Sequence, residues 1–287
     1  MSYILSLQSH VAYGYVGNCV ASFVLQRMGY EVIRINTVQF SNHSGYGNLY
    51  GDIMSLQHLE RVFEGLDNYQ CLDNIKAVIT GYIGDSSLGI VLKKWLQIIQ
   101  HNNPSLIYCC DPVVGDIGRG VYVKDGVADF FINEASAVSN IMTPNHFELS
   151  YLTGIDCSNI DQILFACNIL HNKGVEIVLV TSVLLAEENL NNEISMVLSS
   201  DLGVFKISTP KLDMGVAITG AGDMTASIFL ADYLKTNDGK LSLELTATKV
   251  FQIFEQTKLA NRRELALIQA QNFINAQDIK FIAEQIC

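Results

Sequence analysis

The sequence has little of what linker-rich, repetitive or membrane-spanning chains need. Only 4 of its 287 residues are proline, and no tract is repetitive, which argues against a linker-rich or solenoid protein. No stretch approaches about 18 uncharged apolar residues, so no membrane span is predicted. Charged residues make up only 16% and apolar residues 49%, which excludes disorder as the dominant state. A chain of this length buries roughly 75% of its unfolded surface and needs no disulfide or metal to stay folded.

Basic residues are also scarce. The 18 Lys and Arg residues stand against 29 Asp and Glu residues, which gives a formal net charge of −11. Nucleic-acid binding requires clustered Lys and Arg side chains. The densest basic pair, Arg262-Arg263, is followed by Glu264 and is typical of a solvated helix face. We therefore expect no nucleic-acid partner.

The cysteines indicate a reducing compartment. There are seven of them, an odd number, and no C-x-x-C motif occurs. The N-terminal segment lacks a basic region, so we expect neither a signal peptide nor a location other than the cytoplasm. His10 and His43 lack the spacing of a zinc site, so zinc is not expected.

Segments with the pattern of strands alternate with segments of helical periodicity. Strands are expected at 3–7, 31–35, 77–80, 106–110, 138–142 and 176–181, with an antiparallel hairpin at 194–199 and 203–208. Helices are expected at 18–28, near 55–66, at 86–101, 126–135, 145–152 and 160–172, near 222–235 and 243–258, and over the C-terminus. Polar loops are expected at 8–17 and from 36 onward. The alternation predicts an α/β fold with a mostly parallel sheet and helices on both faces, in one domain over 1–287.

The most informative segment is the turn Gly220-Ala221-Gly222-Asp223, which leads directly into an amphipathic helix. Its amides can form an anion hole at the positive end of the helix, and Asp223 can reach the same concavity. This arrangement suits phosphoryl transfer to a hydroxyl group, whose proton the carboxylate accepts. An ordinary helix N-cap has the same sequence pattern.

Two further polar clusters follow predicted strands. Asp111 ends a buried strand before a proline, which suits a ligand of Mg²⁺ or of its water, but equally a turn aspartate. Asn145 and Glu148 share one face at the start of a helix led by Pro144. They can organise a hydrated cation and a phosphate, or simply form a favourable first turn.

The two early loops, 8–18 and 36–47, are rich in Ser, His, Asn, Tyr and Gly. Such loops suit a small planar ligand with polar substituents. No Walker A motif, protein-kinase glycine loop or G-x-S-x-G elbow occurs.

Together these motifs resemble the ribokinase-like superfamily and, within it, the pyridoxal kinases. The resemblance covers about residues 4–235, and the last 50 or so residues add little to it. It rests on the segments 9–18, 36–43, Gly81-Tyr82, 111–116, Pro144-Asn145-x-x-Glu148 and 220–223. The order and spacing of these motifs make the match specific. The resemblance implies an αβα sandwich, a homodimer, and ATP-dependent phosphorylation of the 5′-hydroxymethyl group of pyridoxal.

The resemblance also implies roles for individual residues. Asp223 would be the catalytic base, and the amides of Gly220, Ala221 and Gly222 would hold the transferred phosphoryl group. The pyridine ring and its substituents would contact Ser9, His43, Ser44 and Tyr82. The nucleotide would contact Asp111, Asn145, Glu148, Thr181, Ser182, Thr209 and Tyr122. Mg²⁺ would be organised by Asp111 and Glu148, partly through water, and a monovalent cation such as K⁺ by Thr143, Thr181 and the Gly220 carbonyl.

Some positions depart from the family pattern. Ala221 lacks the hydroxyl of the Gly-Thr-Gly-Asp version, and Thr181 stands where some bacterial members have lysine. Arg119 lies in a short glycine-containing loop and either contacts phosphate or is a solvated loop residue. Two alternatives stay open, namely a hydroxymethylpyrimidine kinase and a pyridoxal-binding regulatory protein with little turnover. Nothing in the sequence suggests the substrate loop of an ATP-dependent dehydratase on the same fold.

Overall fold

The chain folds around one large β-sheet that contains both parallel and antiparallel strands. The computed structural model describes residues 2–287, and across them the main sheet has ten strands in the order β12-β11-β10-β9-β8-β5-β4-β1-β2-β3. The central pairs from β2 to β9 are parallel, whereas the β3 edge and the β9–β12 edge are antiparallel. The strands are β1 (Tyr3–Tyr13), β2 (Glu31–Asn42), β3 (Gly51–Ile53), β4 (Ile75–Thr80), β5 (Ile107–Cys110), β8 (Ile141–Met142), β9 (Ile177–Val183), β10 (Glu193–Ser200), β11 (Gly203–Pro210) and β12 (Glu284–Gln285). The predicted mostly parallel sheet and the antiparallel hairpin are confirmed.

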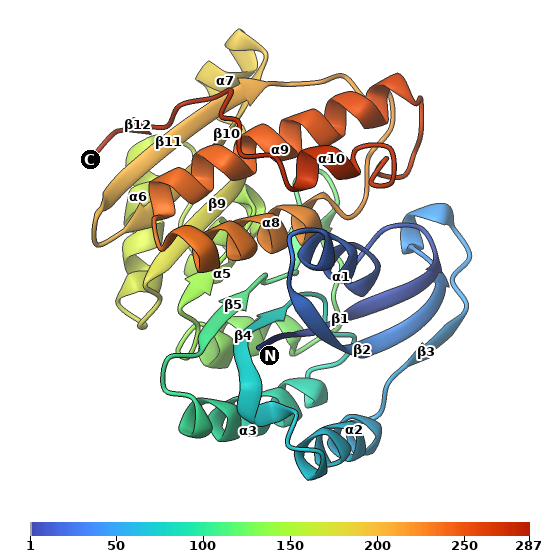
Figure 1. The fold of residues 1–287 in the computed structure, drawn as a ribbon. Helices are drawn as coiled ribbons and strands as arrows, with labels where there is room; N and C mark the ends of the chain where they lie inside the picture. The colour runs from blue at the N-terminus through green and yellow to red at the C-terminus, as the bar shows by residue number, and fades with distance from the viewer. Residues whose placement is uncertain (1) are drawn as a thin grey trace.

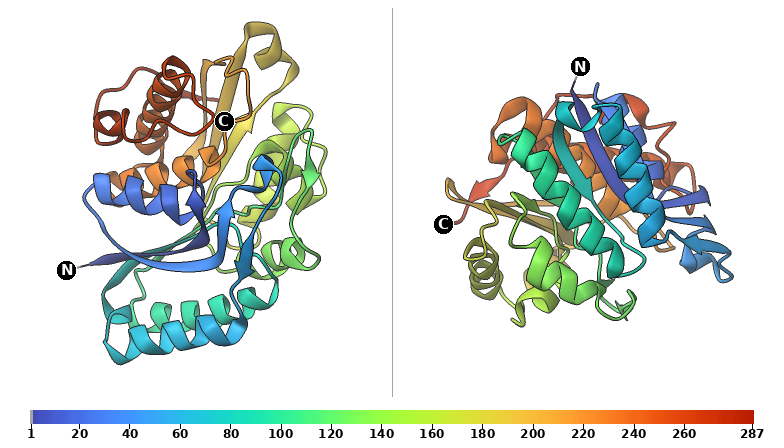
Figure 2. Two further views of the ribbon diagram at one scale, coloured as in Figure 1. Left: turned by 90° about the vertical axis from the view of Figure 1, so that its right-hand side faces the viewer. Right: turned by 90° about the horizontal axis from the view of Figure 1, so that it is seen from below.

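Helices cover both faces of this sheet (Figures 1 and 2). One hydrophobic core lies between the sheet and α2 (Leu56–Asn68), α3 (Ser87–Asn102), α4 (Val127–Phe130), α5 (His146–Thr153) and α6 (Ile160–His171). The other lies between the sheet and α1 (Asn18–Arg27), α8 (Ala221–Thr236), α9 (Gly239–Leu259) and α10 (Gln271–Ile274). A short α7 (Ala186–Asn191) joins β9 to β10. The predicted αβα layering is therefore confirmed.

The two early loops differ from the prediction. Residues 8–13 continue β1 and residues 36–42 continue β2, instead of forming loops. Beyond Leu7, β1 pairs only with β2, with a register shift between Gln8 and His10. With β3, which pairs with residues 38–40 of β2, this extension lies at the right-hand side of Figure 1. Its polar residues misled the prediction, because backbone pairing and the burial of Val11 and Val38 hold it in place.

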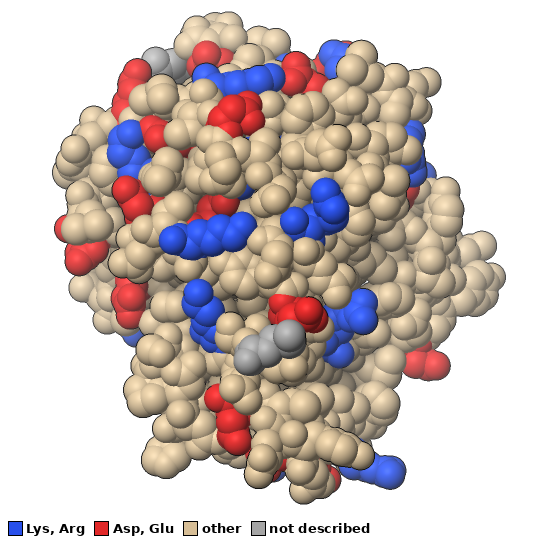
Figure 3. Space-filling model, in the orientation of Figure 1, with Lys and Arg blue, Asp and Glu red and all other residues tan. Residues whose placement is uncertain are grey.

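The C-terminal prediction is wrong in a similar way. After α9 the chain forms turns, the four-residue α10 and the short edge strand β12, instead of a final long helix. The strand expected at 138–142 is only Ile141–Met142 long. Between residues 2 and 287 no helix is both long and apolar enough to cross a membrane. On the face shown in Figure 3, Lys and Arg side chains alternate with Asp and Glu instead of forming one basic patch.

Candidate active site

The glycine turn forms the N-terminus of α8. Gly220 has φ of +82°, a conformation that side chains with a Cβ disfavour, and α8 begins at the next residue. The amides of the first helical turn lack partners within the helix and carry the positive end of its dipole. Asp223 lies in that same turn. The structure thus places the predicted anion hole and the carboxylate on one turn of backbone.

Asp223 faces the beginning of α1. The backbone N–H of Gly17, the residue before α1, lies close enough to its carboxylate to lower the pKa of Asp223. Burial raises the pKa of Asp223 above its ordinary value, and the nearby Gly17 N–H only partly offsets this. Gly17 in turn packs on Ser9, since a Cβ added to Gly17 would lie 2.4 Å from the Ser9 hydroxyl oxygen. Asp223, Gly17 and Ser9 therefore lie together.

Asp111 lies directly beyond β5 and beneath the glycine turn. Its Oδ1 accepts a hydrogen bond of 3.0 Å from the Thr143 hydroxyl, and a Cβ on Gly222 would lie 3.6 Å from its Oδ2. Burial, followed by the charges of Glu148 and Asp223, raises the pKa of this carboxyl well above its usual range. The fold therefore brings together three of the positions predicted for phosphate and metal, namely Asp111, Thr143 and Gly222.

Glu148 lies in the first turn of α5 and accepts three backbone hydrogen bonds. Its Oε1 accepts from the amides of Val114 at 3.0 Å and Gly115 at 3.4 Å, and its Oε2 accepts from Asn145 at 2.9 Å. Burial raises the pKa of Glu148 despite these hydrogen bonds, which lower it. Glu148 therefore fixes the loop after β5 against the start of α5.

Asn145 has a largely structural role at this position. Its Oδ1 accepts from the Glu148 amide at 2.8 Å and its Nδ2 donates to the Gly115 carbonyl at 2.9 Å, so both ends of the amide are engaged. A backbone bridge joins Asn145 to Thr181, whose own amide donates to the Pro144 carbonyl at 2.9 Å. These contacts hold the start of α5 against β9.

Ser182 and Thr209 lie farther along the same edge. Ser182 is exposed in the left-handed region, with φ of +53°, where the pairing of β9 with β10 changes register. Thr209 is buried near the end of β11. A hollow is lined by Asn192 and the segment 211–217. In the sequence this segment lies between Thr209 and the glycine turn.

A small hairpin spans the two halves of the site. It consists of β6 (Gly115–Asp116) and β7 (Gly120–Val121), followed by Tyr122, whose amide donates to the Val114 carbonyl. The Arg119 guanidinium lies 5.8 Å from the centre of the Tyr122 ring. Burial and then the charge of Glu148 are the largest causes that raise the pKa of Tyr122, while Arg119 helps to lower that of His43. Arg119 therefore lies near both the Tyr122 ring and His43.

The side chains predicted to contact the pyridine ring lie within β1 or just beyond the ends of β2 and β4. His43 precedes a single 3₁₀ turn, Ser44–Tyr46, and its Nδ1 accepts from the Gly45 amide at 3.0 Å. Burial is the main cause that lowers the pKa of His43, so the ring is neutral and its proton is on Nε2. Tyr82 follows β4, and burial raises the pKa of its hydroxyl. Ser44 is exposed, and its hydroxyl has no hydrogen bond among the described residues.

The expectation for Arg262, Arg263 and Glu264 is wrong. These residues lie in a bend after α9 and not on a helix, and Glu264 is buried. The carboxylate of Glu264 accepts hydrogen bonds from the Tyr15 amide and the Tyr46 hydroxyl. Sequence reasoning missed this contact because the surrounding residues resemble a solvated surface. Only long-range packing reveals it.

The carboxylates fit a magnesium ion that is held mainly by phosphate and water. Within residues 2–287 no three His, Cys, Asp or Glu side chains are grouped closely enough to hold a metal by themselves. Asp111 nevertheless keeps Oδ2 free beside Gly222, and its charge is crowded by two other carboxylates. Mg²⁺ in nucleotide sites is bound by one or two carboxylates together with waters and phosphates.

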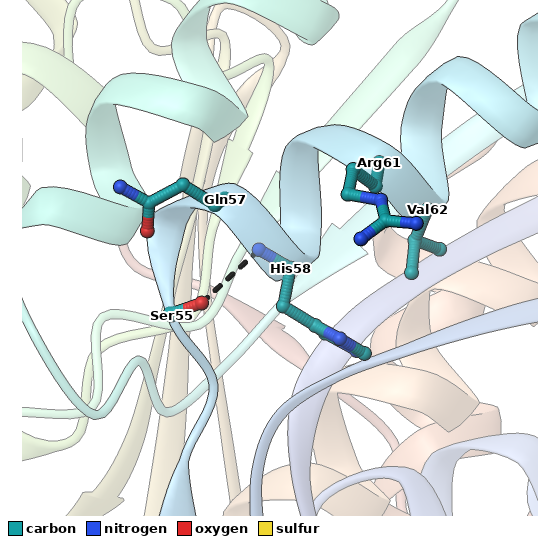
Figure 4. A pocket seen from close by; sticks show the side chains of 5 residues that line it. All are labelled: Ser55, Gln57, His58, Arg61 and Val62. Carbon is teal, nitrogen blue, oxygen red and sulfur yellow. Dashed lines mark hydrogen bonds between the residues drawn. The ribbon is translucent and has the colours of Figure 1, made fainter.

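Another hollow lies on the surface of α2 and is separate from this site. It is lined by Ser55, Gln57, His58, Arg61 and Val62, and Ser55 caps the helix by accepting from the His58 amide (Figure 4). None of the residues predicted for catalysis or binding lines it.

Comparison with known proteins agrees with this geometry. The model of the phosphomethylpyrimidine kinase family matches residues 56–283, so similarity extends well beyond residue 235, where we expected little. The pyridoxal kinase PdxY of Rubrobacter xylanophilus is 38% identical over 99% of this chain and 97% of its own. That of Corynebacterium diphtheriae is 37% identical over 99% of both chains.

Solved structures agree with the relatives found by sequence. The pyridoxal kinase of Entamoeba histolytica superposes with a TM-score of 0.92 at 26% identity and covers 100% of both chains. That of Leishmania donovani, in complex with ADP and pyridoxine, gives a TM-score of 0.91 at 27% identity over 99% of both. The chain therefore belongs to the family described by the phosphomethylpyrimidine kinase model and, within it, to the pyridoxal kinases.

Proposed function

We propose that this protein transfers the γ-phosphoryl group of ATP to the 5′-hydroxymethyl group of pyridoxal. The products are pyridoxal 5′-phosphate and ADP. The observation that carries the proposal is the position of Asp223, which lies beside the free amides of the glycine turn and against Gly17 and Ser9. The named activity of its full-length relatives supports the same reaction.

Asp223 acts as the general base. The acceptor oxygen forms a bond to the γ-phosphorus while the bond from that phosphorus to the ADP oxygen breaks, and the hydroxyl proton passes to the Asp223 carboxylate. The amides of Gly220, Ala221 and Gly222 hold the transferred oxygens at the helix N-terminus, where negative charge is favoured. A pKa raised by burial makes Asp223 a better proton acceptor than an exposed aspartate.

The nucleotide occupies the edge that runs from Asp111 to the segment 211–217. ADP and pyridoxine are bound in the Leishmania structure, which supports a nucleotide co-substrate here. We assign the nucleotide contacts to Asp111, Asn145, Glu148, Thr181, Ser182, Thr209 and Tyr122. Mg²⁺ would be held by Asp111, and through water by Glu148, and would neutralise phosphate charge. K⁺ would lie near Thr143, Thr181 and the Gly220 carbonyl.

Pyridoxal occupies the side of the early strands. The neutral His43 offers an Nε2–H donor to a polar substituent of the ring, because its Nδ1 is already engaged by Gly45. Ser9, Ser44 and Tyr82 supply the remaining hydroxyl groups. We further propose that residues 1–287 form one kinase domain, that the protein is a cytoplasmic homodimer, and that its vitamers include pyridoxine and pyridoxamine.

The test is an acceptor-dependent assay with MgATP, with and without K⁺. We expect pyridoxal to release ADP and pyridoxal 5′-phosphate in equal amounts, with kcat/KM well above that for hydroxymethylpyrimidine. A preference for hydroxymethylpyrimidine would support the alternative kinase, which the name of the matching family model favours. Saturable pyridoxal binding without ADP release would support the regulatory alternative.

A further inference from the structure

Glu264 is a buried carboxylate with no part in the reaction proposed above. It follows α9 and is only 6% exposed. Its Oε2 accepts a hydrogen bond of 2.7 Å from the Tyr15 amide, 249 positions away, and its Oε1 accepts one from the Tyr46 hydroxyl. Both oxygens are therefore used, and each holds a different early segment of the chain.

The neighbouring arginine reinforces the second of these contacts. The Arg263 guanidinium lies 4.0 Å from the centre of the Tyr46 ring and donates to the Gly45 carbonyl. A buried carboxylate is costly unless it is hydrogen-bonded, and both oxygens of Glu264 accept a hydrogen bond. Gly14 packs against the same carboxylate, since a Cβ on it would lie 3.1 Å from Oε2. Its φ of +110° also favours glycine at this position.

The two segments held by Glu264 lead to the two sides of the proposed acceptor site. The amide of Tyr15 contacts Glu264, and its carbonyl oxygen lies against Gly220, where a Cβ would come within 1.9 Å. Tyr46 closes the turn that begins after His43. One carboxylate thereby connects the turn that carries Asp223 with the turn that presents His43.

We propose that Glu264 is a positioning residue for the phosphoryl acceptor. It holds Tyr15 and Tyr46 so that His43 and Asp223 meet the ring and the hydroxyl of the same pyridoxal molecule. It touches neither substrate, and the inference rests on the proposed function. The expected signature is a change in acceptor binding with nucleotide binding preserved, because the contacts of Glu148 and Asp111 lie on other elements.

The test is Glu264→Gln, which keeps the shape of the side chain. Glutamine has one acceptor oxygen, so it can accept a hydrogen bond from only one of the two donors, the Tyr15 amide or the Tyr46 hydroxyl. We expect KM for pyridoxal to rise about tenfold or more, as for the loss of a hydrogen bond to a charged group, while KM for MgATP stays within about twofold. Tyr46→Phe removes one of the same hydrogen bonds. The double variant should therefore be less impaired than the product of the two single effects predicts.

Glu244→Gln is the matched control. Glu244 is a buried carboxylate near the opposite end of α9. Like Glu264, it accepts a hydrogen bond from a distant backbone amide, that of Ala283, at 3.0 Å. Its replacement should lower the melting temperature without changing KM for pyridoxal. Amide hydrogen exchange provides a readout without turnover, since Glu264→Gln should speed exchange at 13–16 and 43–47 but not at 111–116.

The possible outcomes distinguish a failure of the positioning role of Glu264 from a failure of the proposed function. If Glu264→Gln changes both KM values equally, or lowers only the melting temperature as Glu244→Gln does, the positioning role is wrong. If the unaltered protein neither phosphorylates nor binds pyridoxal, the proposed function fails and the role of Glu264 fails with it. A selective rise in KM for pyridoxal, together with the local change in exchange, supports the role.

Discussion

Gly220 and Tyr15 are in direct backbone contact, since a Cβ atom on Gly220 would lie 1.9 Å from the Tyr15 carbonyl oxygen. Gly220 also has a positive φ of 82°, so glycine is required there for two independent reasons. Through this contact the N-terminus of α8, which carries the proposed base, is fixed against the segment that leads from β1 to α1.

Alanine substitutions at the two glycines of the turn should therefore differ. Gly220→Ala adds both a backbone strain and a steric clash, and we expect it to lower the free energy of unfolding by at least about 1–3 kcal/mol. At Gly222 a Cβ would meet only Asp111 Oδ2, at an ordinary 3.6 Å, so Gly222→Ala should have little effect on stability. Urea unfolding of both variants measures the difference. Equal destabilisation would contradict the close contact at Gly220.

Glu148→Gln tests the loop that follows β5. Glutamine has one acceptor oxygen in place of two, and its NH₂ group would face a backbone amide that Glu148 now satisfies. We expect a loss of about 1–3 kcal/mol in stability and a raised KM for MgATP, with KM for pyridoxal unchanged. Glu176→Gln is the control, because Glu176 accepts only an exposed contact from Asn140. A change confined to KM for pyridoxal would overturn the assignment of Glu148 to the nucleotide side.

The pH dependence of turnover should reflect the environment of Asp223. Burial raises the pKa of Asp223 above the ordinary 3.8, and only the deprotonated form can accept the acceptor's proton. As the pH falls, Asp223 is therefore protonated, and can no longer act as the base, at a higher pH than an exposed aspartate would be. We expect kcat/KM for pyridoxal, measured at saturating MgATP, to fall on the acid side with an apparent pKa above 3.8. A profile that stays flat down to that pH in the folded protein would exclude a base of raised pKa.

The sequence predicted the layered fold well because strands buried on both sides and amphipathic helices leave strong local patterns. Asp111 and Asp223 were placed correctly because strand ends and helix starts are local features. The extension of β1 and β2 was missed because its residues are polar, and only pairing between distant segments makes it a strand. Glu264 was missed for the same reason, since its burial depends on partners 218 and 249 positions away.

The most direct test of the account compares Asp223→Asn with the unaltered protein. Asparagine preserves the size of the side chain and an acceptor oxygen near the Gly17 N–H, but it cannot accept the acceptor's proton. The measurement is kcat for pyridoxal phosphorylation, with the affinities for nucleotide and for pyridoxal determined separately by equilibrium binding. We predict a fall in kcat of about 10²–10⁴-fold with both affinities nearly unchanged. An Asp223→Asn protein that phosphorylates pyridoxal at the rate of the unaltered protein would contradict the proposed mechanism.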